Sequence, residues 1–96
     1  MFSWFDAREA QQFGETLAGF FSERVPADDA GKKTPVSKKQ ETVEKMGLQI
    51  QVFKFNHKLN MYKNAKLANS FKWKLLDAGY QSDLVDELTR VILIKL

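Results

Sequence analysis

The feature that most constrains the fold of this chain is residues 37–78, which contain no proline and keep a helical pattern throughout. Ser37 is a residue type that caps helix N-termini, and Gly79 is the type that ends helices in the left-handed conformation. One apolar row recurs between them at helical spacing, and its members are Val43, Met46, Ile50, Phe53, Met61, Ala65, Ala68, Phe71 and Leu75. The sequence therefore predicts a helix over 37–78 with one core-facing side.

The same segment carries a second apolar row, nearly opposite the first. Its members are Leu48, Val52, Phe55, Leu59 and Tyr62. A helix that is apolar on two sides must be covered on two sides. We therefore expect another element, or another chain, to cover this second row.

The length of the segment raises a difficulty for a single helix. At 1.5 Å per residue it would extend about 60 Å, whereas a domain of this size is roughly 30 Å across. We expect the helix to break or to pair with another chain. A break near Gly47 is the least costly, because glycine is about 1 kcal/mol less favourable than alanine inside a helix. An alternative interpretation places short strands near 48–55 and 91–95, because β-branched residues occur in both, and gives an α+β fold.

Two further helices complete the predicted all-α fold of three principal helices. The first spans about 3–24, with Ser3 as its cap and a mainly acidic polar face. The last spans 82–95, begins at Ser82, and folds back on the preceding helix as a helical hairpin. Both prolines fall in 25–36, which we predict to be a flexible linker within one domain, 1–96.

Length and composition exclude several classes of protein. A chain of 96 residues is too short for a multidomain enzyme. It has no cysteine, so it can form neither a disulfide nor a thiolate zinc site, and this favours a cytoplasmic location. No apolar run is long enough to cross a bilayer, so we predict a soluble protein without a transmembrane segment.

The positive charge of the chain is concentrated in its centre. The net charge is only +3, yet residues 46–76 contain lysines and no acidic residue. Lysines bind phosphates and aromatic rings stack on bases, so this stretch suggests an alternative function in binding nucleic acid, another polyanion or an acidic protein. The candidate contacts are Lys54, Lys58, Lys63, Lys66, Lys72 and Lys74. Arginine is absent there, and helical spacing directs these lysines to several sides, which favours an ordinary solvated face.

No arrangement of residues predicts catalysis. His57 is the single histidine and has no nucleophile or second metal ligand at a recognisable spacing, so we interpret it as a histidine at the edge of the core. Asp83, Asp86 and Glu87 are adequately explained by the positive end of a helix dipole. We therefore predict no catalytic residue, no metal site, no cofactor and no enzymatic activity.

The function that follows is a small interaction or assembly protein that forms a homodimer through the second apolar row. Aromatic side chains anchor interfaces well because they bury a large area with few rotatable bonds. The predicted interface residues are Phe55, Leu59, Tyr62 and Trp73.

Overall fold

The protein is all-α. The computed structural model describes residues 7–26 and 36–96, and these ranges contain no strand. The helices are α1 (Arg8–Arg24), α2 (Val36–Asn56), α3 (Met61–Asp77) and α4 (Ser82–Lys95). The predicted fold class is therefore confirmed, with four helices in the described part of the chain.

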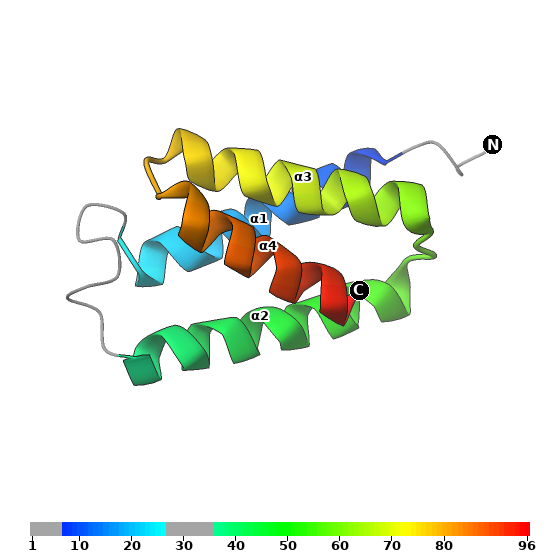
Figure 1. The fold of residues 1–96 in the computed structure, drawn as a ribbon. Helices are drawn as coiled ribbons and strands as arrows, with labels where there is room; N and C mark the ends of the chain where they lie inside the picture. Colours follow the sequence, from blue (N-terminus) through cyan, green and yellow to red (C-terminus); the bar gives the residue numbers. More distant parts are fainter. Residues whose placement is uncertain (1–6, 27–35) are drawn as a thin grey trace.

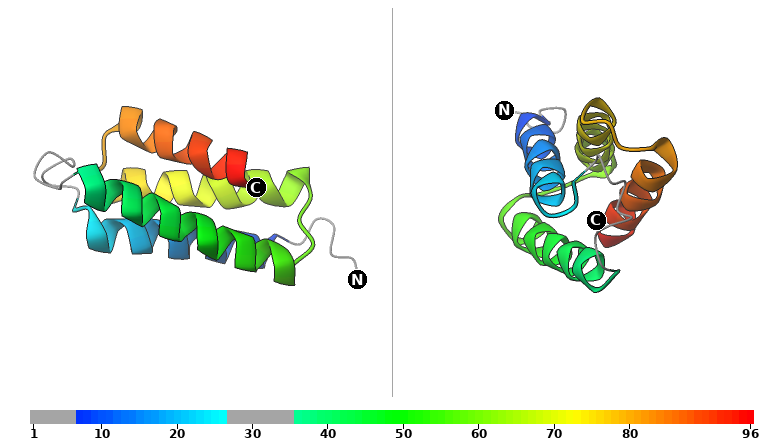
Figure 2. Two further views of the ribbon diagram at one scale, coloured as in Figure 1. Left: turned by 90° about the horizontal axis from the view of Figure 1, so that it is seen from below. Right: turned by 90° about the vertical axis from the view of Figure 1, so that its left-hand side faces the viewer.

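The four helices form an elongated bundle (Figure 1) with principal extents of 46 × 23 × 18 Å. Viewed along its axis in Figure 2, the bundle has α1 beside α3, α3 beside α4, α4 beside α2, and α2 beside α1. The α1–α3 contact is the most extensive of these, and the contacts of α2 with its two neighbours are smaller. One side of α2 therefore lies on the outside of the bundle.

The long helix predicted over 37–78 is two helices, α2 and α3, and the break lies at 57–60 rather than near Gly47. The break is built from caps: the Asn60 side chain accepts a hydrogen bond of 2.8 Å from the Lys63 backbone N–H and begins α3. Gly47 lies within α2, and its missing side chain leaves room for the aliphatic part of Lys95, whose Cδ would lie 3.2 Å from an added Cβ. The helix thus breaks, as its length requires, but the predicted position of the break near Gly47 is wrong.

Two other details differ from the sequence-based expectations. The strand alternative is wrong, because 48–55 lie within α2 and 91–95 within α4, where Ile50 and Ile92 are buried at helical spacing. The N-cap of α4 is Gln81, so Ser82 is the first helical residue instead of the cap. The predicted start at Ser3 and most of the linker 25–36 lie outside the described residues.

The core is tightest where α1 crosses α3. The buried side of α1 has small residues at three positions four apart, Ala10, Gly14 and Ala18. A Cβ built on Gly14 would collide with the main-chain oxygen of Leu67. The absence of a side chain at Gly14 is therefore what permits this close approach.

The turn between α3 and α4 is tied to the end of α1. Gly79 has φ +98°, the left-handed conformation that the sequence predicts for the helix stop. The next residue, Tyr80, is buried, packs its ring 5.7 Å from that of Phe21, and donates a hydrogen bond from its hydroxyl to the carbonyl of Val25. These contacts fix the α3–α4 hairpin against α1.

Candidate functional site: the apolar face of α2

α2 has a buried side and an exposed apolar side. Met46 and Ile50 are 2% and 0% exposed and face the core. Leu48, Val52 and Phe55 are 67%, 61% and 90% exposed, and we call these three residues the α2 face. Their i, i+4, i+7 spacing places them on one side of the helix. No other part of the described structure covers these three side chains.

The last turn of α4 lies beside α2. The Lys54 ammonium donates a hydrogen bond of 3.2 Å to the carbonyl oxygen of Lys95, and the Lys95 side chain packs against Gly47. This turn carries Ile94, which is 78% exposed. Lys54 is the one charged residue in 48–55, and its ammonium is directed at α4, away from the three residues of the α2 face.

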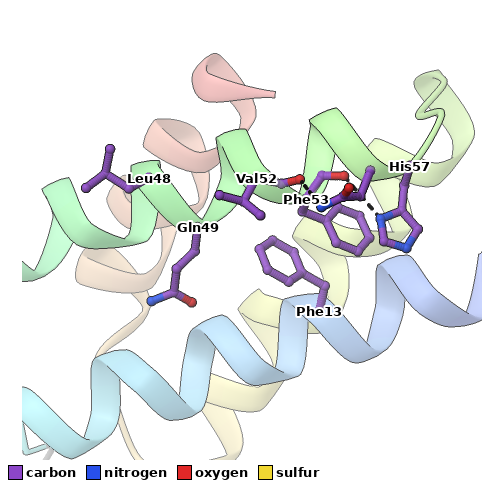
Figure 3. A pocket seen from close by; sticks show the side chains of 7 residues that line it. Phe13, Leu48, Gln49, Val52, Phe53 and His57 are labelled. Atoms are coloured by element: carbon purple, nitrogen blue, oxygen red, sulfur yellow. Dashed lines mark hydrogen bonds between the residues drawn. The ribbon is translucent and has the colours of Figure 1, made fainter.

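A groove of about 410 Å³ runs between α1 and α2 beside this face. Figure 3 shows the Phe13 ring against Phe53, and Phe53 against His57. The ring centroids are 4.2 Å apart for the first pair and 4.1 Å for the second, and both pairs are stacked. Because Leu48 and Val52 also line the groove, the groove and the α2 face form one continuous apolar surface.

His57 lies at the end of this stack, as a histidine at the edge of the core would. Its Nδ1 is 3.1 Å from the carbonyl oxygen of Phe53. Its Nε2 is 3.4 Å from Oε1 of Glu9, on α1. The ring therefore connects the end of α2 to the start of α1.

The structure separates the four predicted interface residues. Phe55 belongs to the α2 face, whereas Leu59 and Tyr62 are half-buried, and Tyr62 packs against the core. Trp73 is exposed, but it lines a separate hollow of about 350 Å³ between α1 and α3. Sequence reasoning did not single out Ile94, another exposed apolar side chain, although the apolar run 91–94 was a signal for it.

The six candidate lysines do not share one surface. Lys54 bonds to α4, and Lys63 donates to the main-chain oxygen of Lys58 at 3.4 Å. The Lys72 ammonium lies 3.7 Å from Asp86, on the α4 side of α3. Lys66, whose ammonium is 5.5 Å from the centre of the Tyr62 ring, and Lys74 line the hollow between α1 and α3 together with the acidic residues Glu15 and Asp77.

Within 7–26 and 36–96, no group of three or more His, Asp or Glu side chains is placed to hold a metal ion. None of the four helices is both long and apolar enough to cross a membrane.

The described ranges thus form a four-helix bundle with an exposed apolar face on α2. The chain matches no protein-family model, and neither the curated proteins nor the solved structures show significant similarity to it.

Proposed function

We propose that this protein is a non-enzymatic assembly protein that forms a homodimer through the α2 face. The observation that carries the proposal is the exposure of Leu48, Val52 and Phe55 on one side of one helix, 61% to 90% each, with no charge among them. Large exposed apolar side chains that adjoin one another mark interaction surfaces, whereas isolated ones do not.

Burial of the α2 face would favour association. Burying one large apolar side chain completely contributes about 1.5–3 kcal/mol. Leu48, Val52 and Phe55 are each more than half exposed, so each has most of this contribution still to gain in an interface.

A second copy of the chain is the partner that this surface fits best. A two-fold dimer uses the same patch on both subunits, so the patch must be compatible with itself. The α2 face is uncharged, and pairing it with itself neither buries an unpaired charge nor opposes like charges. The i, i+4, i+7 spacing is also that of the apolar seam between two packed helices.

The test is the oligomeric state of matched variants. We expect the parent to be dimeric by light scattering at about 10–100 μM. Phe55→Glu should be monomeric, because it places a charge in the seam, and it should keep its helicity because Phe55 makes little contact with the core. Trp73→Glu is the control: its side chain is also exposed but lies between α1 and α3, so this variant should dimerise like the parent.

Salt separates this proposal from association through the lysines. An apolar contact persists or strengthens as salt increases, whereas contacts between lysines and an acidic partner weaken. A parent that is monomeric across this concentration range would refute the proposal. So would a Phe55→Glu variant that dimerises like the parent.

A further inference from the structure

The outer side of α2 changes character halfway along the helix. Continuing the spacing of the α2 face toward the N-terminus reaches Lys45, Glu41 and Lys38, on the same side of the helix. All three are exposed, and the Lys45 ammonium lies 3.3 Å from the Glu41 carboxylate. The outer side of α2 is therefore charged in its first half and apolar in its second half.

A second copy that runs parallel to α2 meets both halves. Identical residues then lie at the same level, so Lys45 faces Lys45 and Glu41 faces Glu41 in continuation of the apolar contact. Like charges brought together in an interface oppose association. The C-terminal ends of the two helices, which are the negative ends of their dipoles, also lie side by side.

A second copy that runs antiparallel to α2 meets the apolar half alone. With the two-fold axis midway between Leu48 and Phe55, each Leu48 lies level with Phe55 of the other copy, and Val52 lies beside Val52. Because α2 ends at Asn56, residues 38–45 extend past the end of the other α2. The apolar side chains therefore meet while identical charges are kept apart.

The residues that become neighbours beyond the apolar contact differ in charge. Residues 41–45 carry Glu41, Glu44 and a single lysine, Lys45, which is paired with Glu41. They lie level with the segment after α2 in the other copy, where residues 57–63 contain Lys58 and Lys63 and no acidic residue. A net negative segment thus approaches a net positive one at both ends of the contact.

We propose that two copies pair through the α2 face with their α2 helices antiparallel, centred between Leu48 and Phe55. This proposal rests on the dimer proposed above and adds its direction and its register.

Distances between spin labels test the direction. The chain has no cysteine, so a label can be attached to Lys45→Cys in one variant and to Lys38→Cys in another. Both positions are exposed, and replacing Lys45 removes only a surface ion pair. In the antiparallel pair, the two copies of a label move apart by about 3 Å for each residue from the centre, which is twice the helical rise.

Pulsed dipolar spectroscopy at about 100 μM protein measures the distance between labels in the two copies. The antiparallel pair predicts a distance about 20 Å longer for the label at position 38 than for the label at position 45. In a parallel pair only the crossing angle separates the helices, and the difference stays below about 10 Å. Adding Phe55→Glu to each labelled chain is the control, and it should abolish the dipolar coupling.

The outcomes separate the direction of the pair from the existence of the dimer. A difference of about 20 Å that Phe55→Glu abolishes supports the antiparallel pair. Similar distances at both positions, also abolished by Phe55→Glu, would overturn the antiparallel direction and leave the dimer intact. Samples without coupling, or with coupling that survives Phe55→Glu, would overturn the dimer through the α2 face and the direction with it.

Discussion

Replacing Gly14 with alanine tests the account of how the bundle is packed. The added Cβ would collide with the main-chain oxygen of Leu67 and would lie 3.1 Å from Cβ of Ser70. A main-chain atom cannot rotate away as a side chain can, so α1 and α3 must separate along their most extensive contact. The separation loosens the buried side chains on both sides of the crossing.

The expected loss of stability can be estimated from two opposing effects. Overpacking a tight core is unfavourable by about 1–3 kcal/mol, and a main-chain collision belongs in the upper part of that range. Alanine is a better helix former than glycine by about 1 kcal/mol, which offsets part of the loss. Gly14→Ala should therefore lower the free energy of unfolding by about 1–2 kcal/mol.

Gly19→Ala is the matched control on the same helix. An added Cβ at Gly19 meets nothing within 4 Å, so only the gain in helix propensity remains. This variant should be more stable than the parent by up to about 1 kcal/mol. Urea unfolding measures both variants, in a Phe55→Glu background so that dimerisation does not contribute. If Gly14→Ala proves as stable as Gly19→Ala, the close approach of α1 and α3 is refuted.

Two further substitutions test the contacts that end and begin helices. Tyr80→Phe removes the hydrogen bond to the buried carbonyl of Val25, so the free energy of unfolding should fall by about 1–3 kcal/mol; an unchanged urea midpoint would show that this bond is not made. Asn60→Ala removes the cap of α3 and should lower stability by about 1 kcal/mol, with faster amide exchange at Lys63. Exchange at Lys63 as slow as in the parent would contradict the cap.

Much of the fold could be predicted from the sequence because the signals are local. The end of α1 at Arg24, the left-handed Gly79 and the span of α4 follow from periodicity and stop residues. The break at 57–60 was missed because propensity alone favours breaking at glycine. The Asn60 side chain caps a new helix at this point by accepting a hydrogen bond from the Lys63 N–H, whereas Gly47 lies inside α2, where the Lys95 side chain of α4 packs against it.

The candidate surface was predictable only in part, and the helix break explains why. A row at helical spacing stays on one side only while the helix is continuous, so the row through Leu48, Val52 and Phe55 does not extend to Tyr62 beyond the break. The approach of the last turn of α4 to Lys54 depends on how α4 crosses α2, which no local pattern encodes. The separation of Trp73 from this row likewise depends on the bundle arrangement.

The measurement that tests the central claim most directly is an isotope-filtered nuclear Overhauser experiment on a mixture of labelled and unlabelled protein. Signals in such a sample arise only from contacts between different copies of the chain. Dimerisation through the α2 face predicts contacts between the ring protons of Phe55 in one copy and the methyl groups of Leu48 or Val52 in the other. A dimer whose intermolecular contacts instead involve Trp73, and none of the α2 face, would contradict the account.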